Sequence, residues 1–357
     1  MLEAIETAEQ SVRLETYIFS PGPLGEQFLA ALVRAQARGC RVAVLVDALG
    51  SYNLPWAFWR PLQSAGGEVR YFNPLALRRF VIRNHRKLLV CDEGVAFVGG
   101  FNIAPEYDGD GITSGWRDLG LRVEGTLSSE LAASFDEMFA RADFRHRLFV
   151  RLRKTGAKKA VLADNQQLLL SGPGRGPNPI KTFLRHDLAR ARSVQMMVAY
   201  FLPTWRIRRQ LVRAAEHGAE VQLLLAGKTD VTLSQLAARS LYRRLLKGGL
   251  EIYEYQPQVL HAKLFIVDDV VYVGSSNLDL RSLQINYELM LRFRSPEMAA
   301  QARGIFRNNL QHCQPIRLSE WRRSRSLWQR LKQRWAYFLL VRIDPYLAQR
   351  QWRALPD

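Results

Sequence analysis

One octapeptide pattern occurs twice in the chain, as HRKLLVCD at residues 85–92 and as HAKLFIVD at residues 261–268. Both copies carry His, Lys and Asp at the same three positions. A pattern that returns after about half the length of a chain indicates two structurally related units. We therefore expect the chain to fold as an internal duplication.

The duplication also includes the segments that precede each octapeptide. Residues 8–21 match 191–203, residues 28–51 match 208–230, and residues 66–74 match 248–257. Each copy of the repeat is predicted to form a strand, an amphipathic helix that ends at a glycine, two more strands and a hairpin. This order predicts an α/β fold of two pseudo-symmetric halves, each a mixed, mainly parallel β-sheet flanked by helices, with one active site at their interface.

Shifts in composition mark the borders of these halves. Residues 151–160 are basic and lack an apolar period, and residues 171–179 are rich in Gly and Pro. We place the first half at residues 1–155 and the second at residues 156–318. Residues 319–357 have no counterpart in the first half and are treated as a separate C-terminal tail.

The spacing within the octapeptide has a chemical meaning. Side chains two positions apart in a strand project from the same face, so the His and the Lys of each copy should meet a common ligand. The pairs are His85 with Lys87 and His261 with Lys263. A neutral imidazole of one copy could attack phosphorus, while the imidazole of the other copy acts as general acid and then as general base.

A small-residue turn that ends in an amide follows each hairpin, GGFN at 99–102 and GSSN at 274–277. Gly and Ser275 in these turns are expected to let backbone N–H groups approach an oxyanion, and Asn102 and Asn277 add side-chain donors. Two His, two Lys and two Asn at one interface favour a phosphodiester. Because the Lys pair can neutralise the phosphate oxygens, we predict neither a metal nor a cofactor.

Four carboxylates accompany these groups. Asp118 and Glu288 occupy equivalent places in the two halves, and each is a candidate to hold one nitrogen of a His and to stabilise its imidazolium. Asp92 and Asp268 lie beside the hairpin turns. We expect these two to bind local backbone or a neighbouring side chain.

These residues resemble the phospholipase D superfamily, whose HxKxxxxD signature occurs twice per active site, and the resemblance extends to about residue 318. The segments ETYIFSPGPLGEQFLAAL, WRDLGLRVEG and GSSNLDLRSLQINYEL are similar to bacterial cardiolipin synthases, and the stretch from AARSLYRRLLKGG to HAKLFIVDD is most similar to their class B form. The resemblance implies transfer of a phosphatidyl group between phospholipids without a metal. It implies as the catalytic set His85, Lys87, Asp92, His261, Lys263 and Asp268, with His85 as the nucleophile.

The chain departs from this family at two places. Family members carry an additional segment with a strand before the first repeat, equivalent to AVLADNQQLLL at residues 160–170 here. Either the start is truncated or mis-assigned, or the first sheet is one strand short. Six residues separate Asp92 from Gly99 but five separate Asp268 from Gly274, which predicts a tighter second hairpin turn.

The charge of the chain indicates an anionic partner. The formal net charge is +18 and the pI is about 10.2, which suits nucleic acid or an anionic membrane. In the tail, apolar residues recur at helical spacing opposite Arg and Lys, which favours a helix in a lipid interface over one packed on the second half. These residues are Trp321, Trp328, Leu331, Trp335, Phe338 and Leu339. Residues 231–249 and 74–84 are further candidates for lipid contact.

Three hypotheses follow from these features. The first is a membrane-bound phosphatidyltransferase that acts on anionic phospholipids, with phosphatidylglycerol as the main candidate, phosphatidylethanolamine as another and no nucleic-acid partner. The second is a hydrolase or nuclease of the phospholipase D type, and the third is a membrane-binding protein with a vestigial site. Three Cys without a CxxC pattern fit a reducing compartment. We therefore expect a peripheral protein on the cytoplasmic face of the bacterial inner membrane.

Overall fold

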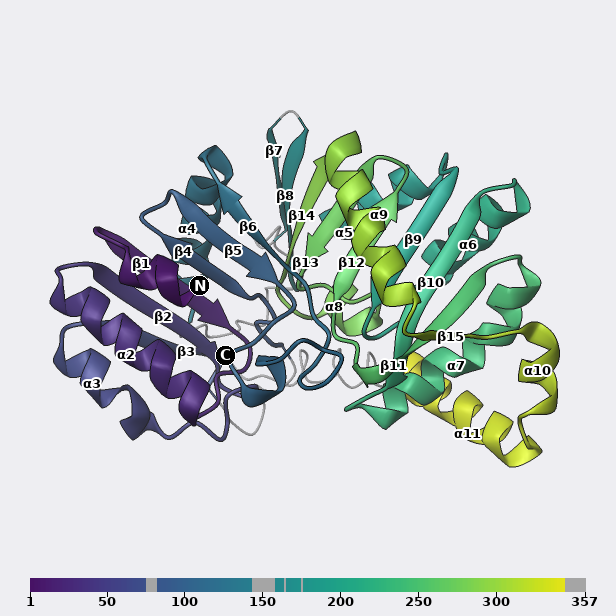
Figure 1. Cartoon of the computed structure of the whole chain (residues 1–357), viewed down its shortest axis with the longest axis horizontal. Coiled ribbons are helices and arrows are strands. Elements are labelled where there is room, and N and C mark those ends of the chain that lie inside the picture. Colours follow the sequence, from purple (N-terminus) through teal and green to yellow (C-terminus); the bar gives the residue numbers. More distant parts are fainter. Residues whose placement is uncertain (75–81, 143–157, 164, 175, 344–357) are drawn as a thin grey trace.

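A computed structural model describes residues 1–74, 82–142, 158–163, 165–174 and 176–343. The described residues form two α/β halves that lie side by side, the first in purple and blue and the second in teal to yellow (Figure 1). The predicted border near residue 155 lies outside the described residues. So do most of the 74–84 tract and the end of the tail.

The first half contains a six-stranded sheet in the order β3-β2-β1-β4-β5-β6. Its strands are β1 (Ser11–Thr16), β2 (Arg41–Asp47), β3 (Glu68–Phe72), β4 (Leu88–Cys91), β5 (Val95–Gly99) and β6 (Gly120–Glu124). Its α-helices are α1 (Leu2–Glu6), α2 (Pro23–Ala37), α3 (Arg60–Ser64) and α4 (Thr126–Ala140).

The second half contains a nine-stranded sheet in the order β15-β11-β10-β9-β12-β13-β14-β8-β7. Its strands are β7 (Lys159–Ala163), β8 (Gln166–Ser171), β9 (Ser193–Val198), β10 (Glu220–Lys228), β11 (Glu251–Val259), β12 (Lys263–Val267), β13 (Val270–Gly274), β14 (Glu288–Arg294) and β15 (Cys313–Pro315). Its α-helices are α5 (Pro179–Leu188), α6 (Trp205–Glu216), α7 (Thr232–Lys247), α8 (Leu280–Gln284), α9 (Pro296–Leu310), α10 (Leu318–Arg323) and α11 (Leu327–Phe338). The run from β11 to β14 repeats the strand order of the first sheet.

The prediction of two α/β halves with mixed sheets is confirmed, but the expectation that the sheets are mainly parallel is wrong. Among the described strands, β1 with β2 and β2 with β3 are parallel in the first sheet, as are β9 with β10 and β10 with β11 in the second. The remaining neighbours in both sheets are antiparallel. Helical crossovers produce the parallel pairs, whereas the chain reverses direction at each hairpin.

The structure shows where the additional strand of the second half lies and how long the two hairpin turns are. The counterpart segment provides β7 and β8, which pair antiparallel and extend the second sheet beside β14, while the first sheet ends at β6. The tighter second turn is confirmed, because residues 92–94 connect β4 to β5 but only residues 268–269 connect β12 to β13.

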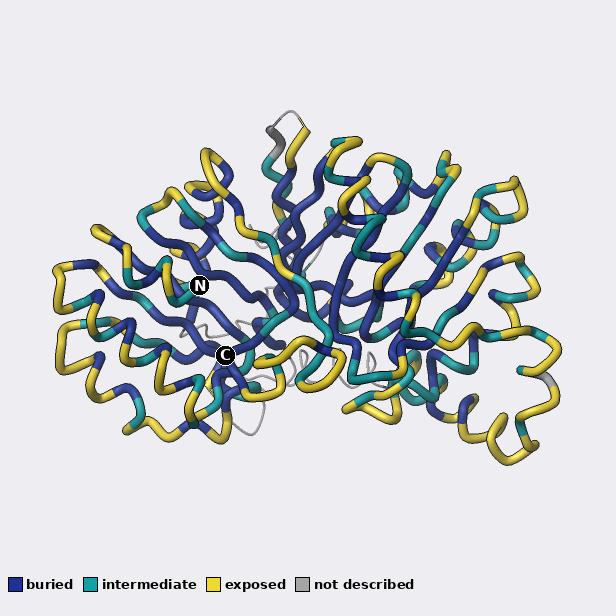
Figure 2. The backbone as a smooth tube through the Cα atoms, viewed as in Figure 1, coloured by how far each residue is buried: buried dark blue, intermediate teal, exposed yellow. Residues whose placement is uncertain are grey.

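The two halves share part of their hydrophobic core. Leu131 and Phe135 of α4 pack in one buried cluster with Leu168 of β8 and with Leu289 and Leu291 of β14. Figure 2 shows buried residues concentrated in the strands and where the halves meet. The halves are thus fixed against each other by apolar burial, the dominant favourable contribution to folding.

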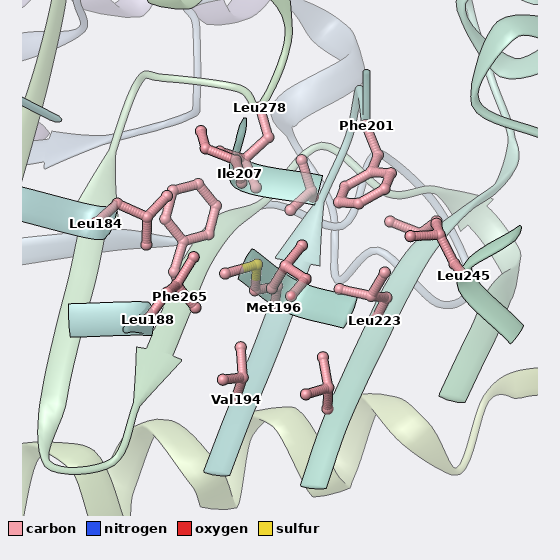
Figure 3. Packing of buried hydrophobic residues seen from close by; sticks show 14 of the residues in the cluster. Leu184, Leu188, Val194, Met196, Phe201, Ile207, Leu223, Leu245, Phe265 and Leu278 are labelled. Carbon is pink, nitrogen blue, oxygen red and sulfur yellow. The ribbon is translucent and has the colours of Figure 1, made fainter. Parts of the chain in front are cut away.

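A separate core lies within the second half. Met196 of β9 and Leu223 of β10 pack with Leu184 of α5, Leu245 of α7 and Phe265 of β12 (Figure 3). This packing fixes the central strands that lead towards the second octapeptide.

Buried ion pairs fix the segment that leads into β4. Arg86 pairs with Glu15 at 3.0 Å, and Arg83 pairs with Asp47 at 3.2 Å, with all four side chains at most 3% exposed. Asn84 Nδ2 donates to Glu15 at 2.6 Å. These contacts hold residues 83–86, and therefore His85, against β1 and β2.

Glu15→Gln should lower the free energy of unfolding by about 3–5 kcal/mol, because it leaves the buried charge of Arg86 without its carboxylate partner. Denaturant titration followed by circular dichroism measures this loss. Glu124→Gln is the matched control, since Glu124 pairs with Arg122 at the surface, where the two side chains are 60% and 62% exposed. Equal stability of the two variants would contradict a structural role for the buried pair.

Candidate active site

His85 precedes β4 and is held by the second half. Its N–H donates to Tyr287 O at 3.0 Å, and its Nδ1 lies 3.1 Å from the carboxylate of Glu288, the first residue of β14. Glu288 is fully buried and also accepts a hydrogen bond from Ser275 Oγ. Glu288 therefore fixes the orientation of the His85 ring and leaves Nε2 as the nitrogen available to a reactant.

His261 precedes β12 and is held by the first half in the same manner. Its N–H donates to Arg117 O at 2.8 Å, and its Nδ1 lies 2.7 Å from Asp118. Glycine is needed at position 100, because a Cβ there would lie 2.3 Å from Asp118 Oδ1. Each His thus takes its carboxylate from the opposite half, so both halves are needed to complete either His–carboxylate pair.

The two lysines lie beside the histidines and not among the residues that line the cavity described below. Lys87 Nζ donates to His85 O at 2.7 Å, and Lys263 Nζ donates to His261 O. Both side chains are at most 1% exposed. Lys263 Nζ also lies 2.9 Å from Nδ1 and 3.1 Å from Nε2 of His261. The lysines therefore place positive charge next to the imidazoles.

Burial shifts the protonation of these groups. Desolvation, with Lys263 nearby, lowers the pKa of His261 to about 4. Desolvation also lowers the pKa of His85, although Glu288 opposes this. The pKa of Lys263 is lowered by burial to about 8, and that of Lys87 well below its ordinary value. At neutral pH both imidazoles are therefore neutral in the free protein, which is the form that can act as a nucleophile.

Asp92 and Asp268 lie at the opposite end of their strands from the histidines. Asp92 accepts hydrogen bonds at 2.8 Å from the backbone N–H groups of residues 9–11, and Asp268 accepts at 3.0 and 2.9 Å from those of residues 192 and 193. Both residues adopt positive φ, 52° and 50°, in the hairpin turns. Each carboxylate therefore ties its hairpin to the start of the neighbouring strand.

The two asparagines line the same cavity as the histidines. Asn102 is anchored, since its Oδ1 accepts from Ile18 N at 3.0 Å and its Nδ2 donates to Tyr107 Oη at 2.7 Å. Asn277 is 2% exposed, and its Oδ1 has no hydrogen-bond partner among the described residues. Asn277 thus offers the cavity a buried polar group.

Two of the turn amides that the sequence predicts to approach an oxyanion are used within the sheets. Gly100 N donates to Leu119 O at 3.1 Å, and Ser275 N donates to Leu289 O at 2.9 Å. These bonds continue the pairing of β5 with β6 and of β13 with β14 by one residue. The small residues therefore serve the carboxylates, because Gly100 makes room for Asp118 and Ser275 binds Glu288.

Both histidines open into one cavity of about 380 Å³. Its wall includes residues that the sequence did not single out, namely Tyr17, Arg83, Tyr107, Trp116, Tyr200, Asp230 and Arg281. The sequence contained a signal for Tyr17 and Tyr200, because aromatic residues end the first strand of each repeat, at 17–19 and 200–201. Within the described ranges, no group of three or more His, Cys, Asp or Glu side chains could hold a metal ion.

Helix α11 packs on α7 with one side and faces solvent with the other. Its buried side includes Gln333 and Ala336. Its exposed side carries the apolar stripe, which consists of Leu327, Trp328, Leu331, Trp335 and Phe338. The predicted single apolar face is wrong for Trp321, which packs on Tyr242 with ring centroids 4.9 Å apart, while Leu339 is half-buried.

The tail also reaches the cavity that holds the histidines. Leu340, just after α11, lines this cavity together with Val231 and Ser234 at the start of α7. Val231 and Leu233 are exposed apolar residues at the same end of α7. The rim of the cavity is therefore continuous with the packed pair of helices α7 and α11.

Comparisons with known proteins identify the family of the chain. Residues 1–141 and 184–310 match the family model described as "Cardiolipin synthase, PLD-like domain". The chain is 35% identical to cardiolipin synthase B of Salmonella typhi over 82% of this chain and 72% of that protein. It is 30% identical to cardiolipin synthase 1 of Bacillus anthracis over 93% and 67%. It is 32% identical to the major cardiolipin synthase ClsA of Bacillus subtilis over 93% and 70%.

Among solved structures, phosphatidylserine synthase of Haemophilus influenzae is similar, with a TM-score of 0.72 at 15% identity over 97% of this chain and 91% of that one. At this identity the likeness concerns the fold alone. The family match and the curated relatives together show that the chain belongs to the cardiolipin synthase family of phospholipase D-like phosphatidyltransferases.

Proposed function

We propose that the protein moves a phosphatidyl group from one phospholipid to the hydroxyl of phosphatidylglycerol through a phosphohistidine, and releases glycerol or another small alcohol. One observation carries this proposal. Two neutral histidines open into a single cavity, and each is bound at Nδ1 by a carboxylate of the opposite half. This arrangement suits one nucleophile and one proton carrier.

In the first step, Nε2 of His85 attacks phosphorus, and the bond from phosphorus to the headgroup oxygen breaks. His261 supplies a proton to the departing alkoxide, and the bound phosphate anion favours the imidazolium that this step requires. In the second step, His261 removes a proton from the acceptor hydroxyl, which attacks phosphorus and breaks the bond to His85. The assignment of His85 as nucleophile rests on the family resemblance.

The surrounding residues support these steps. Lys87 and Lys263 supply positive charge as the phosphate oxygens gain electrons, and Arg83 and Arg281 add guanidinium groups to the cavity wall. Asp118 and Glu288 stabilise whichever imidazole is protonated. Asp92 and Asp268 act only by holding the hairpins in shape.

The lining of the cavity favours a lipid over nucleic acid or water as the second substrate. Apolar side chains belong to this lining, namely Ile18, Leu49, Leu202, Val231, Leu280 and Leu340. A phospholipid acceptor can bury its glycerol and acyl ends against such a lining, whereas a nucleic-acid strand gains little there.

The apolar stripe of α11 supplies the contact with the membrane. Trp328 is 64% exposed and Trp335 is 56% exposed, and Arg330, Lys332 and Arg334 lie on the same helix. A helix with a Trp-rich face flanked by basic residues lies in the plane of an anionic bilayer. No helix in the described part of the chain is long and apolar enough to cross a membrane. We propose peripheral binding to the cytoplasmic face of the bacterial inner membrane.

Incubation of the protein with phosphatidylglycerol labelled at phosphorus, in mixed micelles with or without EDTA, tests the reaction. We expect cardiolipin and glycerol in both cases. His85→Ala and His261→Ala should each lower turnover by roughly 10⁴-fold or more, because both groups act in one sequence of steps. Only His261→Ala should accumulate label on the protein, since it keeps the nucleophile.

His186→Ala is the matched control for these variants, because the His186 side chain is 80% exposed and lies outside the cavity. Phosphatidic acid as the sole product would identify a hydrolase. Strict EDTA sensitivity would contradict the metal-free mechanism, and near-normal turnover in either active-site variant would contradict the two-His mechanism.

The pH dependence of kcat/KM on a water-soluble phosphodiester should reflect the lowered His pKa values. A lowered pKa keeps an imidazole neutral further into acid, and kcat/KM reports groups of the free enzyme. The acid limb, on which the nucleophile His85 becomes protonated, should therefore lie below pH 6.5, the ordinary His value. Circular dichroism across the same range controls for unfolding. An acid limb centred at or above the ordinary His value would disprove the assignment.

Trp328→Ala combined with Trp335→Ala should weaken binding to phosphatidylglycerol vesicles by roughly tenfold or more, because burial of a large apolar side chain contributes about 1.5–3 kcal/mol. Hydrolysis of a soluble phosphodiester should be affected much less. Trp56→Ala is the control, since Trp56 is 63% exposed in the first half. Equal losses of vesicle binding and soluble activity would show instead that the stripe is part of the fold.

A further inference from the structure

A second cavity, of about 300 Å³, lies between α7 and α11. It is lined by Ser240, Arg243, Arg325, Arg330, Gln333 and Arg334. Four of these side chains are arginines, and within the described part of the chain none of the lining residues is acidic. We call this feature the arginine cavity. None of its residues belongs to the cavity that holds the histidines.

Arg325 forms a fixed base for the arginine cavity. Its Nε donates to Trp321 O at 2.9 Å and its Nη1 donates to Gln333 Oε1 at 2.9 Å. Its guanidinium also lies 4.4 Å from the ring centroid of Trp321, which in turn packs on buried Tyr242. These contacts orient the guanidinium in advance and do not use Nη2, so a ligand would bind without much loss of side-chain entropy.

The electrostatics of the arginine cavity favour an anion. Burial, together with the charges of Arg330 and Arg243, lowers the pKa of Arg325. Like charges gathered around one cavity repel each other unless an anion lies between them. Guanidinium groups bind phosphate oxygens through paired, charge-assisted hydrogen bonds, which makes a phosphate group the best match for several arginines.

The position of the arginine cavity indicates where that phosphate comes from. Arg330 and Arg334 are one turn apart on α11, the same helix that exposes Trp328 and Trp335 on its apolar stripe. When Trp side chains lie at the headgroup level of a bilayer, basic residues beside them lie among the lipid phosphates. The arginine cavity is therefore next to the surface expected to meet the membrane.

We propose that the arginine cavity binds the phosphate group of an anionic phospholipid in the bilayer, at a site distinct from the one where lipids react. This inference rests on the proposed contact between α11 and the membrane. Helix α7 contributes Ser240 and Arg243 to the arginine cavity and Ser234 to the cavity with the histidines. A lipid bound between α7 and α11 would thus hold the mouth of the active site against the bilayer.

Sedimentation with vesicles of phosphatidylcholine, with and without phosphatidylglycerol, tests the proposal. Arg243→Gln with Arg334→Gln should weaken binding to the anionic vesicles by roughly tenfold or more, since each basic residue at an anionic surface contributes to the free energy of membrane binding. Changing the same two residues to Lys keeps the charge but removes the paired hydrogen bonds, so binding to the anionic vesicles should stay nearly as weak as in the Gln variant. The control is Arg41→Gln with Arg60→Gln, which removes two exposed charges from the first half and should have little effect.

Three outcomes would overturn the proposal. The first is wild-type binding by the Lys variant, which would reduce the arginines to general surface charge, and the second is an equal loss in the control. The third is stabilisation of the wild type, but not of the Gln variant, by inorganic phosphate at constant ionic strength, with vesicle binding the same in both. That result would assign the arginine cavity to free phosphate.

The test does not depend on catalysis. Arginine variants that lose vesicle binding in a protein unable to make cardiolipin would support this inference while the proposed reaction failed. Active protein whose arginine variants bind vesicles normally would overturn this inference alone.

Discussion

The candidate active site depends on one crossed arrangement, in which each histidine is bound by a carboxylate from the other half of the chain. His85 lies 3.1 Å from Glu288, and His261 lies 2.7 Å from Asp118. The backbone supports the same crossing, because the segment before each His pairs with the segment before the opposing carboxylate. A half on its own therefore contains a histidine without its acid. The duplication produces a site only when both copies meet.

This arrangement requires a rigid border between the halves, since charged and polar groups are buried there at a cost in free energy. The shared apolar cluster of α4, β8 and β14 offsets that cost and fixes the distance between the two sheets. The burial that carries this cost in free energy also lowers the pKa of both histidines and both lysines. Stability and chemistry therefore depend on the same packing.

The second half carries an additional layer of function on its outer side. Helices α7 and α11 connect the mouth of the active site, the apolar stripe and the arginine cavity in one surface. This is the surface that we propose to meet the bilayer, and it combines apolar and cationic side chains with the mouth of the candidate active site. The described residues of the first half contain no equivalent of this surface. After α4 the chain continues into the second half, whereas after α9, the equivalent helix, it continues into the tail.

The sequence by itself determined the duplication, the identity of the histidines, lysines and asparagines, and the candidate acids Asp118 and Glu288, because spacing along strands and recurrence at equivalent positions are visible without a fold. It could not reveal which acid serves which histidine, since that contact joins residues 203 and 143 positions apart. It predicted too much parallel pairing, and it did not reveal that Gly100 makes room for Asp118 or that Ser275 binds Glu288. It also placed Trp321 with the exposed aromatic residues of the tail, although packing on Tyr242 removes it from that face. Periodicity and residue type report local geometry, whereas partners, burial and the arginine cavity arise only when distant segments pack together.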